Sequence, residues 1–409
     1  MRGLSKSIRG VALATVLVAA AACSSSSSGN GGNSGGGSGP GLTSDSITIG
    51  TVATITGPVP GLFQGAVTGV EAYANYINSQ GGINGRKLVV KSLDDGFSCA
   101  QEASQVTQAL PNVFAFVGSF TLNDGCGARA LTNKSTPWIA YGFGDALKTL
   151  PTYFSPAPNH PTGFVTGPFA WLKQKFGLTT VGQLYSATGA AETQKAELNA
   201  INSVGIKTGY TRGIGATESD FSADVQRMKS AGVDYVEADL PPSDAKILLT
   251  EIKQANFHPK LISDAALYGA DSLKQLGDPT LANGVVGPVG FGLFLSKNPA
   301  PGIALMNKWI AQVPNAGSAD LYSVYGWASA ELFADALKAA GTNPTQQSVL
   351  TALKGIHSFD SGGVLPTANV GSQVPGHCWV IFEAKNGGFV TMHPSTGFDC
   401  AGTYLKSGS

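Results

Sequence analysis

Short runs of β-branched residues alternate with longer helix-patterned segments from Ser46 onward. In the first unit, residues 47–53 predict a strand, and the turn Thr56-Gly57-Pro58 follows it. The next segment spaces its apolar residues three or four apart, as one buried face of a helix requires: Phe63, Val67, Val70, Ala74 and Ile77. Strands that alternate with helices build a mostly parallel sheet with helices on its faces, so the predicted fold class is α/β.

This alternation predicts two series of elements. The first is expected to have strands at 47–53, 87–92, 113–117 and 138–141 and a helix at 101–109. The second is expected to have helices at 164–176, 190–204, 220–231 and 243–256 and strands at 180–185, 206–210, 235–238 and 259–263. The proline-rich stretch 155–161 between them resists helix formation and suits a crossover. Helices at 304–312 and 318–341 and a small antiparallel addition at 378–391 complete the prediction.

The length of the chain favours two lobes. Roughly 365 residues follow the N-terminal segment, whereas a single hydrophobic core seldom grows beyond about 250–300 residues. Two separate cores are therefore expected.

The N-terminus has the pattern of an export signal at 1–22. Basic residues (Arg2, Lys6 and Arg9) precede an apolar run from Val11 to Ala22, which is shorter than the roughly 20 residues that span a bilayer. The run ends at Ala20-Ala21-Ala22-Cys23, which resembles the bacterial lipobox, although a lipobox usually has Leu where this chain has Ala20. The resemblance implies lipidation of Cys23, and ordinary secretion is the alternative.

Residues 23–44 are predicted to be a lipidated linker, because Ser24 to Gly41 is almost entirely Ser, Gly and Asn. Such a composition buries too little apolar surface to offset its chain entropy. The G-x-S-x-G match at 32–36 is a chance match, because a hydrolase serine needs a strained turn between a strand and a helix.

The charge is nearly balanced. Removing the three signal-peptide cations from the 26 basic residues leaves 23 against 26 acidic residues, a net charge of −3. No basic cluster could neutralise phosphates, so nucleic acid is not expected as a partner.

Four cysteines remain in the body of the chain: Cys99, Cys126, Cys378 and Cys400. An even number in an exported protein predicts two disulfides, for which three pairings are possible. The pairing of Cys99 with Cys126 and of Cys378 with Cys400 is favoured, because each bond closes a short loop worth about 3 kcal/mol. Their spacing matches no metal-binding motif, so neither a metal nor a cofactor is expected.

Three strings in register resemble the type I periplasmic binding proteins, specifically the branched-chain amino acid (Leu/Ile/Val) binding family that feeds ABC importers. They are ITIGTVATITGP, INSQGGINGRKLVVKSLDDG with its nearby Cys99, and TESDFSADVQRMKSAGVDYV. Together with the order of elements, the match runs from about residue 46 to about residue 360.

This resemblance implies two doubly wound open-sheet lobes joined by three crossovers. Lobe one would comprise 45–158 and 289–358, and lobe two 159–288 and 359–409. A solute would bind at the carboxyl ends of the strands, and hinge closure would bury it. The implied protein is a monomer, lipid-anchored to the outer face of the cell membrane, that delivers a small solute to ABC permease subunits.

Three loops of lobe one are expected at the solute by this resemblance. They contribute Thr56, Gly57 and Phe63 after the first strand, Phe120, Thr121 and Leu122 after the third, and Gly142, Phe143 and Gly144 after the fourth. A plain turn would also explain Gly57, and burial in the lobe would also explain Phe143. Leu122 stands where the family has a hydroxyl group, with Ser119 or Thr121 as the nearest substitutes.

In lobe two the sequence departs from the family. The positions that carry tyrosines in amino-acid-binding members fall on 188–191 and 239–241, where this chain has no tyrosine, and the family's carboxylate position falls on 263–266. The expected site residues here are Ala190, Asp239, Leu240 and Asp264, although Asp264 could instead cap a helix. Burying an unpaired ammonium costs several kcal/mol. A less zwitterionic solute is therefore predicted, such as an organic acid, an amide or a small peptide.

A sensory receptor is the alternative function, and an enzyme is a third. A sensory receptor on the same fold would signal to a membrane partner instead of feeding a transporter. An exported enzyme is not expected, because the sequence contains no coherent nucleophile, metal or paired-acid arrangement, and Asp94-Asp95 is interpreted as a structural pair.

Overall fold

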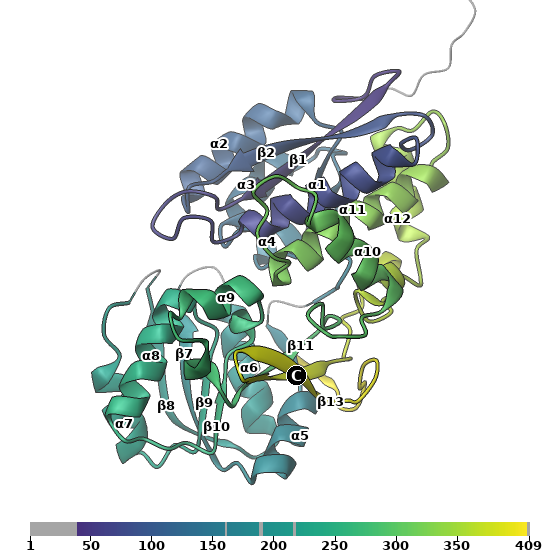
Figure 1. Ribbon diagram of the computed structural model, residues 1–409. Coiled ribbons are helices and arrows are strands. Elements are labelled where there is room, and N and C mark those ends of the chain that lie inside the picture. Colours follow the sequence, from purple (N-terminus) through teal and green to yellow (C-terminus); the bar gives the residue numbers. More distant parts are fainter. Residues whose placement is uncertain (1–38, 160–161, 188–190, 216–217, 407–409) are drawn as a thin grey trace, which may run out of the picture. The chain divides into compact units, whose positions relative to one another are not determined.

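The computed structural model describes residues 39–159, 162–187, 191–215 and 218–406 (Figure 1). The predicted signal peptide, Cys23 and most of the predicted linker lie outside these residues. The described residues form one compact unit.

The first sheet contains five parallel strands in the order β2-β1-β3-β4-β5. They are β1 (Ser46–Ala53), β2 (Lys87–Asp94), β3 (Ala115–Val117), β4 (Trp138–Ile139) and β5 (Tyr153–Phe154). The β3, β4 and β5 strands are short and fully buried, as parallel strands between helix layers usually are. We call this sheet and its helices the first lobe.

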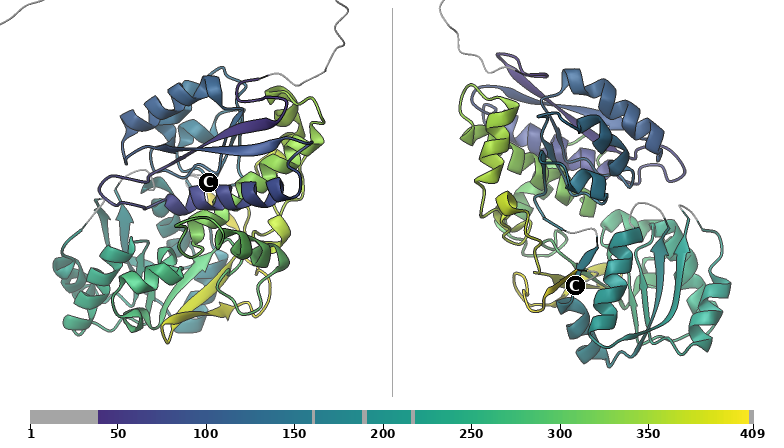
Figure 2. Two further views of the ribbon diagram at one scale, coloured as in Figure 1. Left: turned by 45° about the horizontal axis from the view of Figure 1, so that its top comes forward. Right: turned by 180° about the vertical axis from the view of Figure 1, so that it is seen from behind.

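Helices cover both faces of the first sheet (Figures 1 and 2). One face packs against α1 (Gln64–Ser79) and α11 (Leu321–Ala339), and the other against α2 (Cys99–Ala109). The remaining helices of this lobe are α3 (Asp124–Ala128), α4 (Asp145–Lys148), α10 (Pro301–Ile310) and α12 (Gln346–Lys354). A capping box of Asp320 and Ser323 begins α11, where each residue satisfies a backbone N–H of the other.

The second sheet has seven strands in the order β13-β12-β11-β10-β9-β7-β8. Five are parallel: β7 (Thr180–Ser186), β8 (Lys207–Ile214), β9 (Tyr235–Ala238), β10 (Leu261–Ser263) and β11 (Val285–Val289). The antiparallel strands β12 (Val380–Lys385) and β13 (Gly388–His393) extend the sheet beyond β11, which confirms the predicted antiparallel addition. We call this sheet and its helices the second lobe.

Helices also cover both faces of the second sheet. The α5 (Gly167–Phe176) and α6 (Ala191–Ser203) helices pack on one face, and α7 (Ser222–Ser230) and α8 (Pro242–Gln254) pack on the other. The short α9 helix (Ala270–Gln275) follows β10.

One predicted helix begins later than its sequence suggested. Residues 164 and 165 were predicted as helical, but they belong to β6 (Gly163–Val165), which pairs antiparallel with β14 (Tyr404–Lys406). Pairing with a strand some 240 residues away overrides the local helical pattern, a common effect of tertiary context.

The chain passes between the sheets three times: after β5, after β11 and after α12. Two doubly wound sheets joined by three crossovers confirm the predicted fold class. The structure also contains the favoured disulfides, Cys99–Cys126 and Cys378–Cys400. In the described ranges, no helix is both long and apolar enough to cross a membrane.

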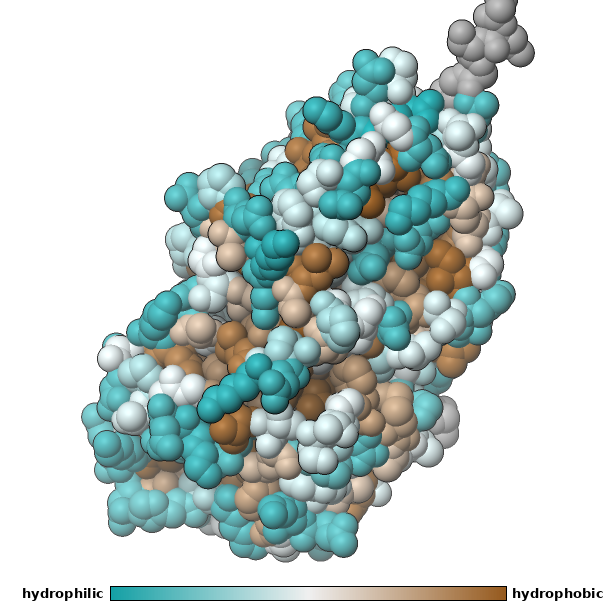
Figure 3. All heavy atoms as spheres, turned by 45° about the vertical axis from the view of Figure 1, so that its right-hand side comes forward, coloured by the Kyte–Doolittle hydropathy of each residue, from teal (hydrophilic) through white to brown (hydrophobic). Residues whose placement is uncertain are grey.

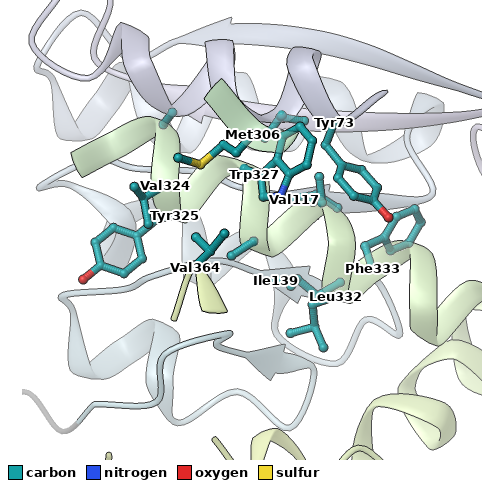
Figure 4. Close-up of a cluster of buried hydrophobic side chains, with 14 of the residues drawn as sticks. Tyr73, Val117, Ile139, Met306, Val324, Tyr325, Trp327, Leu332, Phe333 and Val364 are labelled. Atoms are coloured by element: carbon teal, nitrogen blue, oxygen red, sulfur yellow. The ribbon is translucent and has the colours of Figure 1, made fainter. Parts of the chain in front are cut away.

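The closest helix packing in the first lobe is that of α11 on α1, which Gly69 and Gly326 permit. A Cβ atom at Gly326 would overlap the carbonyl oxygen of Ala66, and one at Gly69 would overlap that of Ser323. Beside this crossing, Trp327 packs edge-to-face on Tyr73 at a ring-centroid distance of 5.0 Å. Figure 4 shows these rings inside the cluster, whereas Tyr325 projects away from them. The crossing therefore fixes where the N-terminal turn of α11 lies.

We predict that Gly326→Ala lowers the free energy of unfolding by about 1–3 kcal/mol or more, the usual range for an overpacked core. The added methyl group meets backbone, which cannot rotate away. Chemical denaturation measures the change. The matched control is Gly125→Ala in α3, where the new Cβ would lie 3.8 Å from the Ala146 side chain. Equal stability of Gly326→Ala and wild type would contradict the close packing.

Candidate functional site

A cavity of about 290 Å³ lies at the carboxyl ends of strands from both sheets. Its lining residues follow β3, β4, β9, β10 and β11 in the chain, where ligands bind in open α/β sheets. In the view of Figure 3, hydrophobic residues reach the surface mainly across the middle, with hydrophilic residues to either side. The position of this cavity at the strand ends makes it the candidate site.

The first lobe supplies an aromatic wall centred on Phe120. Its ring contacts five others at centroid distances of 5.0–6.0 Å: Phe63, Tyr141, Phe143, Tyr322 and Tyr325. Leu122 and Leu62 extend this wall. Phe63, Phe120, Leu122 and Phe143 were expected at the site, and the structure brings all four to the cavity.

The N-terminal turn of α11 brings Tyr322 and Tyr325 to the cavity. Three positions separate them, so they lie on one side of the helix. Burial raises the pKa of both hydroxyl groups, so both are uncharged. The site therefore includes the phenolic hydroxyls of two tyrosines from α11, a helix that follows the second lobe in the sequence and packs in the first lobe.

A buried carboxylate holds the 142–144 turn. Asp124 accepts hydrogen bonds from the backbone N–H groups of Phe143 (2.6 Å) and Gly144 (2.8 Å). The backbone N–H of Gly142 donates to the Tyr153 hydroxyl. Gly142 and Gly144 thus shape the turn without lining the cavity, and only Phe143 of this group lines it.

Two aspartates hold the loops around β1 and β3. Asp94 accepts hydrogen bonds from the backbone N–H and the hydroxyl of Thr56, and Asp95 accepts one from the hydroxyl of Thr121. Gly57 packs against the Gly96 carbonyl. Thr56, Gly57 and Thr121 therefore do not line the cavity, because their polar groups or close backbone packing serve the loop. The pair at 94–95 is structural, as interpreted from the sequence.

The second lobe supplies the polar side of the cavity. Three residues of the first turns of α6 line it, namely Thr193, Gln194 and Glu197, together with Asp239 and Leu240 after β9. Asp239 and Leu240 were expected here. The expected residue Ala190 lies outside the described residues.

Four carboxyl groups gather beneath this side of the cavity: Glu197, Glu237, Asp239 and Asp264. Burial raises the pKa of each, and the neighbouring carboxylates raise those of Glu197, Glu237 and Asp264 further. Glu237 accepts hydrogen bonds from the Tyr235 and Ser263 hydroxyls, and Asp239 accepts one from the Ala265 N–H at 3.1 Å. The charged groups that act on Glu197 are Glu237 and Asp239, and both are carboxyl groups.

Asp264 does not line the cavity. It is 3% exposed and accepts a hydrogen bond from the backbone N–H of Ala266 at 3.1 Å, which caps the short 3-10 helix Ala265–Leu267. The capping alternative therefore describes its position.

The described lining residues include no Lys, Arg or His. An organic acid, one of the predicted solutes, would therefore meet two carboxyl groups and no cation among them. Ser119, named as a substitute hydroxyl, accepts a hydrogen bond from the Val52 N–H and does not line the cavity.

A second cavity of about 200 Å³ adjoins the first and shares Tyr141, Phe164, Thr193, Gly290 and Tyr325 with it. It extends toward Cys378 and the crossover segments. The two cavities together leave room for an elongated solute.

Sequence reasoning missed Tyr141, Tyr322, Tyr325, Thr193 and Glu197. The helical spacing of the two α11 tyrosines was visible, but their distance of some 200 residues from the Phe120 loop gave no reason to combine them. Thr193 and Glu197 are four positions apart on a predicted helix, which places them on one face. A polar pair of this kind gives no local sign that the face points inward, yet both residues are buried.

A family model for periplasmic binding proteins matches residues 46–388. The Leu/Ile/Val-binding protein homolog 1 of Brucella suis is 24% identical over 336 residues, which cover 75% of this chain and 82% of that protein. A fatty acid ABC transporter substrate-binding protein from Thermomonospora curvata has a similar structure, with a TM-score of 0.74, 18% identity and 89% and 94% coverage. A branched-chain amino acid ABC transporter protein from Thermus thermophilus with bound valine has a TM-score of 0.72, 19% identity and 87% and 97% coverage.

The buried carboxyl cluster predicts a pH-dependent stability. Because the pKa of Glu197 is raised above its ordinary value of 4.5, the folded chain retains a proton that the unfolded chain loses, and stability falls as pH rises above that value. We predict that Glu197→Gln stabilises the protein at about pH 8, by about 1–3 kcal/mol, and less at about pH 5. Thermal unfolding at both pH values measures this.

The control variant is Glu192→Gln on the same helix, where the carboxylate is exposed and pairs with Lys195. It should leave the pH dependence unchanged. A Glu197→Gln protein that is less stable than wild type at both pH values would contradict the repulsion within the cluster.

Proposed function

This chain belongs to the periplasmic binding protein family, and from that premise we propose that it captures a small organic solute between its lobes and delivers it to an ABC importer. A protein of this family binds a solute and is not an enzyme. The observation that carries the proposal is the cavity at the carboxyl ends of both sheets, lined from both lobes.

The proposed contacts in the first lobe are Phe63, Phe120, Leu122 and Phe143, and those in the second are Asp239 and Leu240. Thr56, Gly57, Thr121, Gly142, Gly144 and Asp264 support them, since each belongs to a loop behind the lining. Tyr322, Tyr325 and Glu197 join the set because they line the same cavity. A lining with so many rings suits a solute that is apolar over most of its surface.

A free branched-chain amino acid fits this lining poorly. Its carboxylate needs a cation or several hydrogen-bond donors, but the Thr121 hydroxyl donates to Asp95 and Ser119 does not line the cavity. Among the described lining residues it would meet neutral hydroxyl groups, no cation and two carboxyl groups, and burying a charge without an ionic partner costs several kcal/mol. We therefore keep the proposal of a less zwitterionic solute.

We also propose that the protein is anchored to the outer face of the cell membrane through a lipid on Cys23. A Ser/Gly linker after that residue would hold the binding lobes near a permease and raise their effective concentration there. The proposal rests on the lipobox-like string that ends at Cys23.

The purified protein should bind one solute tightly and turn none over. In a thermal-shift screen of a broad solute library, a ligand at 100 times its dissociation constant stabilises a binding protein by about 2.7 kcal/mol. Phe143→Ala should weaken binding of the solute found by the screen by about tenfold or more, since it removes an apolar wall. Titration calorimetry measures both affinities.

Phe176→Ala in α5 is the matched control, because Phe176 is also partly buried but packs in the second lobe away from the cavity. Its affinity should equal that of wild type. Micromolar binding of leucine would contradict the proposed solute class. In the native host, deletion should abolish solute uptake, whereas loss of gene induction with intact uptake would identify a sensory receptor instead.

Cys23→Ser should move the protein from the membrane fraction to the soluble exported fraction, because a thioether-linked lipid requires the thiol. Cell fractionation and incorporation of labelled fatty acid measure this change. Ser24→Ala is the control and should remain in the membrane fraction. A Cys23→Ser protein that stays membrane-bound would overturn the proposed anchor.

A further inference from the structure

We propose that the solute is a small organic cation with an apolar body and no carboxylate, whose charged head Glu197 holds. The inference rests on the proposed function and names the chemical class of its solute. It is carried by three observations: the charge of the cavity, a buried hydroxyl group without a partner, and the aromatic rings of the first lobe.

The charge of the cavity is one-sided. Glu197 and Asp239 line it, Glu237 and Asp264 lie directly behind, and none of the described lining residues is basic. Buried charges in proteins are paired, because an isolated ion loses its hydration without compensation. The described chain supplies no cation at this place, so a cationic solute would provide the missing partner.

One buried polar group on α6 remains without a partner. The Thr193 hydroxyl, on a side chain 9% exposed, has no hydrogen-bond partner in the described structure. One turn later, Glu197 is 4% exposed, and the charged groups that act on it are the carboxyl groups of Glu237 and Asp239. Thr193 and Glu197 both line the cavity. Buried polar groups are nearly always hydrogen-bonded, so the Thr193 hydroxyl marks where a polar group of the solute would bind, beside the Glu197 carboxyl group.

The wall opposite consists of rings. Phe120 and Tyr322 lie 5.0 Å apart between centroids in an edge-to-face arrangement, and Phe63 packs on both. Ring faces attract cations by about 0.5–2 kcal/mol, and the same rings bury an apolar body. A neutral solute would use only the apolar part of this wall, whereas an amine or quaternary ammonium head would use both parts.

Binding should release a proton. Glu237 and Asp239 act on Glu197, and Glu197 acts in turn on Tyr235. Asp239 also acts on Asp264 and on Tyr322 of α11. Every one of these groups is acidic or neutral, so the empty cluster retains protons. A cation favours the ionised carboxylate, and the displaced proton passes to solvent. Affinity for a cation should therefore rise with pH, by up to about tenfold per unit.

The test compares four compounds with one aromatic body by titration calorimetry of the whole exported protein: 2-phenylethylamine, 2-phenylethanol, 3-phenylpropanoate and L-phenylalanine. We expect the amine to bind at least about tenfold more tightly than the other three. Between about pH 5 and about pH 8 its affinity should rise, while that of the alcohol should stay constant. A matched series with an n-hexyl body covers the case of an aliphatic solute.

Glu197→Gln should weaken amine binding by about tenfold or more and abolish its pH dependence, while alcohol binding changes by less than about threefold. Glu192→Gln should bind like wild type, because its exposed carboxylate lies outside the cavity. The pH readout distinguishes a contact of Glu197 with the charge from a general disturbance of α6.

An amine that binds no better than the alcohol in both series overturns the inference. Tighter binding of the carboxylate or the amino acid overturns it as well, but leaves the solute-binding function intact. If no compound of either series binds, and a strain that lacks the gene takes up solutes normally, the proposed function itself is overturned.

Discussion

The close crossing of α11 on α1 determines what the cavity can be. Gly69 and Gly326 allow the two backbones to approach so closely that a Cβ atom at either position would overlap the backbone of the other helix. That approach fixes the start of α11, and with it the positions of Tyr322 and Tyr325 against Phe120. The site therefore depends on α11, a helix of the first lobe that comes in the sequence only after most of the second lobe.

The buried carboxyl groups of this protein have two different roles. Asp94, Asp95 and Asp124 accept several hydrogen bonds each from backbone or hydroxyl donors and so hold the loops that carry the aromatic wall. Glu197 instead lines the cavity, and burial and the nearby Glu237 and Asp239 raise its pKa. A carboxyl group with a raised pKa in a cavity wall can meet a solute, whereas a carboxylate that holds a loop cannot, which is why Glu197 indicates a site and the others do not.

Much of the fold could be predicted from the sequence, because alternating strand and helix patterns are local. The exception, the strand at 163–165, forms through pairing with Tyr404–Lys406, and no local pattern reveals such a partner. The site was predictable where it follows a strand directly, as with Phe120, Phe143 and Asp239. It was not predictable where tertiary packing turns a polar helix face inward, as with Thr193 and Glu197, or where distant segments meet, as with Tyr322.

The carboxyl cluster is also unfavourable for the empty protein. Four acidic side chains share one buried region, and their mutual repulsion raises the pKa of Glu197, Glu237 and Asp264 after burial has already raised it. Replacing buried charges by neutral groups often stabilises a protein, so folding alone gives no reason to keep all four carboxyl groups. Solute binding gives such a reason, because a carboxyl cluster without a positive partner in the empty protein is stabilised most by a solute that brings a positive charge. A cationic solute relieves the repulsion among these carboxyl groups, whereas an anion or a neutral molecule does not. The repulsion in the empty protein therefore favours a cationic solute over the other two classes.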